Sequence, residues 1–115
     1  MKIVKIKKFI VSFLILALSA PAYCGDSEGP VKRYLVIIQG KVFFSAGAAT
    51  SRPACNTTDE WAIDLVGTNA AIGRAMLAVI MSAHASGKNV HVYGTGKCDV
   101  WGDRETATGV IALEN

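Results

Sequence analysis

The chain has 115 residues, of which 51% are hydrophobic and 18% charged, and its formal net charge is +3. The first 24 residues contain four lysines and no acidic residue, so the remaining 91 residues carry 8 basic and 9 acidic side chains, a net charge of −1. A segment of that length suffices for one small domain. Because no excess of positive charge remains, nucleic acid is not expected as a partner.

Residues 1–24 have the features of a secretory signal peptide. Lysines come first, the apolar run Phe9–Leu18 follows, and small residues lead up to Ala22, which is the order that such peptides share. The apolar run is too short for a permanent membrane-spanning helix. Cleavage after Cys24 and cleavage after Ala22 both satisfy the small-residue requirement, and cleavage after Cys24 is preferred because Gly25–Gly29 would be a natural mobile start. We therefore expect an exported protein, either periplasmic or secreted.

Two cysteines remain beyond residue 24, Cys55 and Cys98. An exported protein meets an oxidising environment and a domain this small usually needs a staple, so a disulfide between them is predicted. Closely spaced ligand pairs such as Cys-x-x-Cys, which mark zinc sites, do not occur in the sequence. Neither a metal ion nor another cofactor is expected.

The rest of the chain has the pattern of strands, one helix and further strands. Thr68–Ser86 contains no proline and is rich in helix-forming residues, and Gly87 is placed to end the helix in a left-handed conformation. Strands are predicted from β-branched and aromatic residues or from alternating apolar positions. They are Lys32–Ser45, as one bent strand or two short ones, Trp61–Val66, Asn89–Tyr93 and Thr108–Leu113. The polar start Gly25–Gly29 is expected to be mobile.

This order predicts an α+β, mostly β fold in which a single helix covers a small, strongly bent antiparallel sheet. A five-stranded antiparallel barrel of the oligonucleotide/oligosaccharide-binding (OB) type, with one central helix between its third and fourth strands, fits the order. A flat sheet with one helix across it is the alternative. Residues 25–115 are expected to form this single OB-like domain, without repeats or linkers.

The predicted helix is apolar on two sides. Residues at helical spacing form one face that is expected to pack on the sheet. These residues are Ile72, Ala75, Met76, Val79, Ile80 and Ala83. A helix that is apolar all round is normally buried, so either the opposite face meets another subunit or the surface is unusually apolar, and we expect the interface of a homo-oligomer. The interface residues are Ala71, Leu77, Ala78, Met81 and Ala85.

No constellation of residues predicts catalysis, so no catalytic residues are assigned and the protein is not expected to be an enzyme. Asp99, Asp103 and Glu105 belong to a loop-like segment of alternating charges, which favours a solvated turn over a metal or acid/base site. Neither His84 nor His91 has an evident partner in the sequence.

The two tryptophans have different surroundings in the sequence. Trp61 begins an alternating strand and is expected in the core. Trp101 stands beside Gly102 and charged residues, and an exposed indole next to polar groups is suited to stack on a sugar or grip a protein. Trp101, Asp103 and Arg104 are therefore the candidate ligand-binding residues. The alternative places Trp101 over the core beside the disulfide.

Several short motifs also occur in a known protein family. They are the valine/isoleucine strand Val36–Gln39, Ala54-Cys55 followed by Trp61, the alanine-rich helix ending in Ser86-Gly87-Lys88, and the Val-x-Val strand Val90–Val92. With these motifs the chain resembles the receptor-binding subunits of pentameric bacterial toxins, specifically the group similar to the binding subunits of subtilase cytotoxin and typhoid toxin. The tract from Ala85 to Asp103 resembles short uncharacterised secreted bacterial proteins more closely, but that resemblance implies no activity.

The toxin resemblance implies an OB-type barrel, a pentamer whose helices line its axis, recognition of a cell-surface glycan, and an enzymatic A subunit as a partner. The chain departs from those subunits because it lacks their extended segment before the last strand and has one predicted disulfide where they carry more. No residue matches their serine-centred sugar pocket. The rival interpretation is a periplasmic or surface protein that binds another protein, as an accessory or inhibitor, and has no sugar site.

Overall fold

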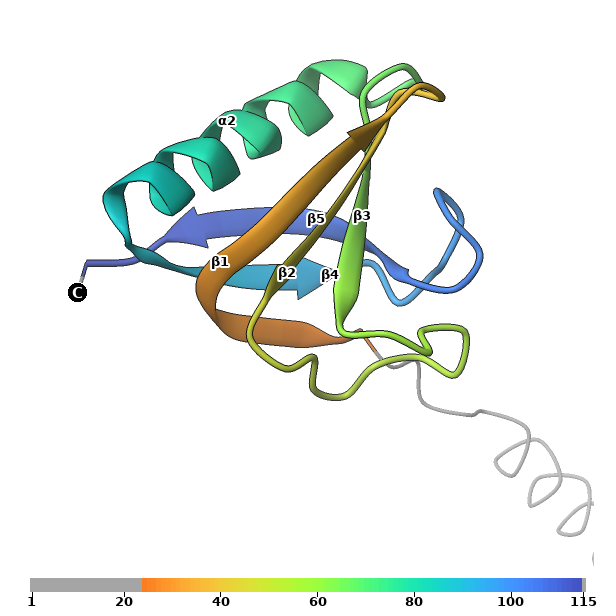
Figure 1. The fold of residues 1–115 in the computed structure, drawn as a ribbon. Coiled ribbons are helices and arrows are strands. Elements are labelled where there is room, and N and C mark those ends of the chain that lie inside the picture. Colours follow the sequence, from red (N-terminus) through yellow and green to blue (C-terminus); the bar gives the residue numbers. More distant parts are fainter. Residues whose placement is uncertain (1–23, 115) are drawn as a thin grey trace, which may run out of the picture.

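The computed structural model describes residues 24–114, so the predicted signal peptide lies outside the described residues except for Cys24. Among the described residues, five strands and one helix follow one another along the chain (Figure 1). They are β1 Asp26–Ile37, β2 Lys41–Ala46, β3 Glu60–Asp64, α2 Ala70–Ser86, β4 Asn89–Gly94 and β5 Glu105–Ala112. A five-stranded sheet with one helix confirms the predicted mostly β class. Within residues 24–114, no helix is long and apolar enough to cross a membrane.

The strands pair in a ring. β1 is antiparallel to β4 along its first half and to β2 along its second half, and the pairing continues from β2 through β3 and β5 to β4. β1 takes part in two pairings because it bends at an irregularity between Val31 and Arg33. The pairing of β3 with β5 is parallel, which corrects the prediction of an antiparallel sheet throughout. A ring of five strands cannot alternate in direction all the way round, so one neighbouring pair must be parallel.

The segment that was expected to be mobile is the first half of β1. Asp26–Pro30 pairs with β4, and Thr50 holds the first residue of the strand by two backbone hydrogen bonds of 2.8 and 3.1 Å. Ser27 is buried and accepts a 2.9 Å hydrogen bond from the indole N–H of Trp61. The mobility prediction is therefore wrong, because the polar groups of this segment have partners elsewhere in the ring.

The strand predictions otherwise lie close to the observed positions. Lys32–Ser45 contains two strands, and Gly40, with a φ of 75°, sits in the turn between them. β5 begins three residues earlier than predicted, at Glu105. Trp61 is fully buried, as expected.

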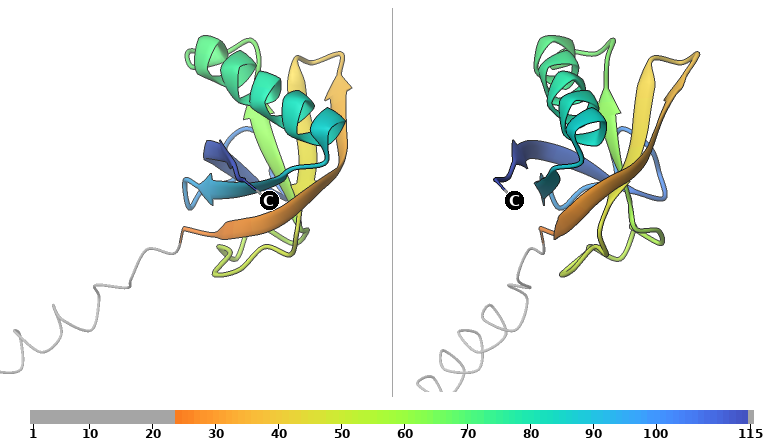
Figure 2. Two further views of the ribbon diagram at one scale, coloured as in Figure 1. Left: turned by 90° about the vertical axis from the view of Figure 1, so that its left-hand side faces the viewer. Right: turned by 60° about the vertical axis from the view of Figure 1, so that its left-hand side comes forward.

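α2 lies across one end of the ring and packs against β1, β3 and β5 (Figures 1 and 2). The core fills the space between the strands and this helix. Its fully buried side chains include Val42, Phe44, Trp61, Ile63, Ile80, Val90 and Val92.

The helix is rotated from the predicted orientation. Its buried residues are Gly73, Ile80 and Ala83, whereas Ile72 is 57% exposed and Ala75 is exposed as well. Gly73 gives the physical reason, because a Cβ there would overlap the carbonyl oxygen of Asp64. The helix backbone approaches β3 at a residue without a side chain, and this contact turns Ile72 and Ala75 away from the core.

The opposite face of α2 is exposed over most of its length. Ala71, Ala78, Met81 and Ala85 are solvent-exposed, while Leu77 is half-buried and packs against the core. Leu77 thus lies at the border of this face. The predicted interface residues other than Leu77 are not covered by any part of residues 24–114.

Gly73→Ala is expected to destabilise the protein, although glycine to alanine inside a helix normally stabilises by up to about 1 kcal/mol. The added methyl group would force α2 away from β3 and loosen the packing around Ile80. Urea unfolding of both proteins measures the difference. Gly102→Ala is the matched control, since a Cβ there meets open space, and equal stability of the two variants would contradict the explanation.

Candidate functional site

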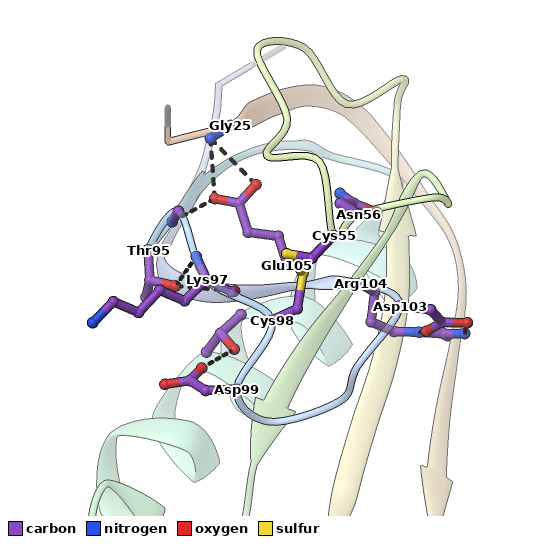
Figure 3. The surroundings of a disulfide bond; sticks show 12 residues. Gly25, Cys55, Asn56, Thr95, Lys97, Cys98, Asp99, Asp103, Arg104 and Glu105 are labelled. Atoms are coloured by element: carbon purple, nitrogen blue, oxygen red, sulfur yellow. Dashed lines mark hydrogen bonds and ion pairs between the residues drawn. A yellow bond between two sulfur atoms is a disulfide. The ribbon is translucent and has the colours of Figure 1, made fainter. Parts of the chain in front are cut away.

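Two loops are joined at one end of the ring. Residues 47–59 connect β2 to β3, and residues 95–104 connect β4 to β5. Cys55 and Cys98 form the predicted disulfide between them, with Cα atoms 6.1 Å apart (Figure 3). The two cysteines are 43 residues apart in the sequence. On the chain-entropy model, the disulfide stabilises the fold by on the order of 4 kcal/mol, because it lowers the conformational entropy of the unfolded chain. The disulfide thereby fixes the 95–104 loop, and it is compatible with an exported protein.

The 95–104 loop packs on the outer face of β2. The rings of Trp101 and Phe43 meet edge to face with their centroids 5.0 Å apart, and the guanidinium carbon of Arg104 lies 4.4 Å from the Phe43 centroid. Phe43 is only 5% exposed, whereas Trp101 remains 36% exposed. Trp101 therefore lies between the two predicted placements, an exposed indole and a ring packed against the protein. It covers the buried Phe43 ring and still presents part of its own surface to solvent.

The three candidate ligand residues lie together, but Arg104 is largely occupied. Its Nε donates to Asp103 at 2.8 Å and its Nη1 donates to Glu60 at 3.0 Å. The hydrogen bond between Arg104 and Asp103 lowers the pKa of Asp103 and raises the pKa of Arg104. Arg104 thus holds the loop against β2 and β3, and Trp101 and Asp103 are the members of the group with surface left for a ligand.

A groove of about 410 Å³ borders the same loop. β3 and β5 pair only at Trp61–Glu105 and Ala62–Thr106, and the groove opens beyond these pairs, next to the start of α2. Figure 3 shows Asp99 and Arg104 pointing to opposite sides of the loop. The loop therefore separates the groove from the Trp101 surface.

The groove combines hydrogen-bonding and apolar side chains. Its neutral polar residues include Thr68, Asn69, Thr95 and Thr108, and its apolar residues include Ile63, Ile72 and Val100. The charged groups are mostly paired, since Lys41 Nζ lies 2.9 Å from Asp64 Oδ1 and the Thr106 hydroxyl donates to Asp99 at 2.6 Å. The hydrogen bond from Lys41, with one from the Val66 N–H, lowers the pKa of Asp64.

Glu105 is not part of a solvated turn, which corrects the sequence interpretation. It is the first residue of β5 and is fully buried. Its carboxylate accepts hydrogen bonds from the N–H groups of Gly25 and Gly96. The charged neighbours in the sequence concealed this position, although Glu105 and Ala107 share the two-residue period of an inward-facing strand.

Both histidines have partners, which also differs from the sequence interpretation. His91 lies 3.0 Å from Asp26 and 3.2 Å from Glu28, and His84 Nδ1 lies 2.8 Å from the carbonyl oxygen of Val31. All three partners belong to β1, more than 50 residues away in the chain. A hydrogen bond from Thr50, followed by the contacts with His91, lowers the pKa of Asp26. Among the described residues, no group of three or more potential ligands is arranged to hold a metal ion.

Acidification is expected to destabilise the fold through Asp26, Asp64 and Asp103, whose pKa values are all lowered in the folded state. Such carboxylates stabilise the protein above about pH 4, and that contribution is lost as the pH falls through their folded pKa. Thermal unfolding between neutral and acid pH measures the loss. In Asp64→Asn the melting temperature should fall less steeply with decreasing pH than in the wild type. The control Glu114→Gln, at an exposed position near the end of the chain, should show the same pH dependence as the wild type. An unchanged profile in Asp64→Asn would contradict this assignment.

The site therefore consists of a disulfide-fixed loop with a mixed groove on one side and a half-exposed tryptophan on the other. Neutral donors and acceptors are placed beside apolar side chains in the groove, an arrangement that can contact a ligand of mixed character. Comparison with known proteins adds no family to this description: no family model, no curated protein and no solved structure matches the chain.

Proposed function

We propose that the chain is an exported, non-enzymatic binding module that resembles a toxin B subunit and recognises a glycan as a homo-oligomer. The observation that carries this proposal is the groove beside the disulfide-fixed loop, where threonine hydroxyls and the Asn69 amide adjoin apolar side chains. A sugar presents hydroxyl groups and apolar C–H faces together, so a site of mixed character suits it. An enzymatic A subunit would be a further partner in a toxin-like assembly.

The fold assigned in this proposal is the OB type. The pairing order β1-β2-β3-β5-β4, closing back on β1, and a helix between the third and fourth strands support it. OB folds bind oligosaccharides and oligonucleotides on the face of strands 2 and 3 and on the loops 1–2 and 4–5. Trp101 lies in the corresponding 4–5 loop and packs on β2. The predicted net charge of −1 beyond residue 24 favours a sugar over a nucleic acid.

Trp101→Ala tests the loop surface opposite the groove, where the exposed indole offers a second contact for a glycan, and it is expected to weaken glycan binding more than stability. Its ring is 36% exposed, whereas Trp61 is fully buried, and Trp61→Ala should cost about 3 to 5 kcal/mol of folding free energy. A glycan array on the wild type identifies the ligand, and titration calorimetry with urea unfolding separates the two effects. Equal destabilisation by both substitutions would assign Trp101 to the core.

Asn69→Ala tests the groove separately. Asn69 precedes α2 but its side chain makes no capping hydrogen bond, so stability should change little, while loss of one ligand hydrogen bond should reduce affinity about tenfold. If the wild type binds no glycan on the array but a protein partner instead, the rival function of a protein-binding accessory or inhibitor replaces this proposal.

The homo-oligomer part of the proposal is supported by the exposed side of α2. Ala71, Ala78 and Ala85 recur every seven residues there, and Met81 is 47% exposed. Small side chains let a second helix approach closely, and an apolar strip over several turns is unfavourable in water. The pentamer implied by the resemblance is one arrangement that covers this strip.

Ala78→Glu is expected to leave the ring folded and to dissociate the oligomer. Glutamate is compatible with a helix surface, but in an interface it would bury an unpaired charge. Sedimentation velocity of the wild type and the variant decides the matter. Gln39→Glu, in the exposed turn after β1, is the control that should not dissociate the oligomer. A wild type that is monomeric at micromolar concentration would remove this part of the proposal.

A further inference from the structure

The buried carboxylate of Glu105 is not explained by the fold or by the groove. Glu105 is 0% exposed. Within residues 24–114 its oxygens accept hydrogen bonds from main-chain N–H groups alone, Gly25 at 3.0 and 3.2 Å and Gly96 at 2.8 Å (Figure 3). No cationic side chain among the described residues forms a salt bridge with it. A carboxylate in such a place is strongly unfavourable unless a counterion joins the hydrogen bonds.

Two glycines provide the space that this carboxylate occupies. A Cβ at residue 25 would lie 2.5 Å from Glu105 Oε1 and 3.0 Å from the carbonyl oxygen of Thr50. A Cβ at residue 94 would overlap the Glu105 carboxylate. The pocket therefore accommodates the nitrogen of residue 25 only when that residue carries no side chain.

Gly25 directly follows the predicted cleavage site of the signal peptide. Hydrolysis by a signal peptidase adds the hydroxyl of a water molecule to the carbonyl carbon of Cys24 and a hydrogen to the nitrogen of Gly25. The freed α-amino group has an ordinary pKa of about 8, so at neutral pH it binds one more proton and becomes an ammonium group. The nitrogen that lies 3.0 Å from Glu105 Oε2 would then be positively charged.

We propose that Glu105 is the binding site for the N-terminal ammonium group that forms when the chain is cut between Cys24 and Gly25. Processing then supplies the counterion of the buried carboxylate. Because one of the carboxylate's other hydrogen bonds comes from Gly96, the ion pair also fastens the start of the 95–104 loop to the start of β1. The inference concerns maturation of the chain and does not depend on which ligand the groove binds.

The contacts of residue 25 are arranged so that it stays in place after cleavage. Its carbonyl oxygen accepts a 2.9 Å hydrogen bond from the Gly94 N–H, and Asp26 is held by Thr50 through backbone bonds of 3.1 and 2.8 Å. None of these bonds uses the nitrogen of Gly25. Cys24, in contrast, is exposed, so the chain leaves the pocket at the bond that is cut.

The pocket also distinguishes between the two cleavage positions that the sequence allows. Cleavage after Ala22 would leave two residues in front of Gly25, the Gly25 nitrogen would remain a neutral amide, and the ammonium group would lie outside the pocket. Only cleavage after Cys24 brings the positive charge to Glu105.

The first test is to export the full-length precursor and to measure the intact mass of the processed protein, which should begin at Gly25. The matched control carries one alanine inserted between Cys24 and Gly25, so that the processed chain begins one residue earlier. In that control the Gly25 nitrogen is an amide with the contacts described above, and the preceding residue takes the exposed position of Cys24. A processed chain that begins at any residue other than Gly25 would overturn the proposal.

The second test measures coupling between the N-terminus and Glu105 in these exported proteins. With Glu105 present, the inserted alanine should lower the folding equilibrium constant about tenfold or more, because it removes the counterion of a buried charge. In Glu105→Gln the same insertion should no longer lower the constant and should raise it, since it moves an ammonium group that has lost its counterion out of the pocket. Equal effects of the insertion in both backgrounds would overturn the proposal.

A third measurement needs no substitution of Glu105 and applies even if Glu105→Gln fails to fold. The α-amino group is acylated with a small reagent at neutral pH, and peptide mapping follows its modification. A buried, ion-paired ammonium group should react at least about tenfold more slowly in the wild type than in the alanine-inserted control. Equal rates in the two proteins would likewise overturn the proposal.

Discussion

The double pairing of β1 is the constraint on which the rest of the structure depends. One bent strand joins β2 along its second half and β4 along its first half, so the two ends of the sheet are brought together. This closure creates the enclosed space that Trp61 and Phe44 fill, and α2 covers one end of it. The loops 47–59 and 95–104 then meet at the other end (Figures 1 and 3), where a disulfide can join them.

The candidate site follows from this arrangement. Because the disulfide fixes the 95–104 loop, Trp101 and Arg104 can cover Phe43 on the outer face of β2. Without the disulfide, holding this irregular loop in one conformation would cost much conformational entropy. The same loop contributes Asp99 and Val100 to the groove, so the two surfaces that could meet a ligand share one rigid border.

Features of the fold that are set by neighbouring residues in the sequence were predicted correctly. Local sequence predicted the strand around Trp61 and the helix that ends at Ser86. It also predicted that Gly87 ends the helix in a left-handed conformation, and Gly87 has a φ of 71°. The disulfide was predictable because only two cysteines lie beyond the predicted signal peptide, which leaves one pairing. Of the candidate site, the grouping of Trp101 with Asp103 and Arg104 was predictable from their closeness in sequence.

Features that depend on distant contacts were not predictable. The rotation of α2 follows from the approach of Gly73 to Asp64, and the partners of His91 lie on β1. Burial of Glu105 requires the backbone of Gly25, 80 residues away. The groove has no signature in the sequence at all, because it arises where β3 and β5 stop pairing.

The single parallel pairing gives the ring a seam. An odd number of strands requires one parallel contact, and here it spans only two residue pairs, whereas the antiparallel contacts on either side are longer. Local opening of a protein follows its least-stabilised interface. Amide protons along the facing edges of β3 and β5 should therefore exchange with solvent before those between β1 and β2, and separation of the seam would widen the groove.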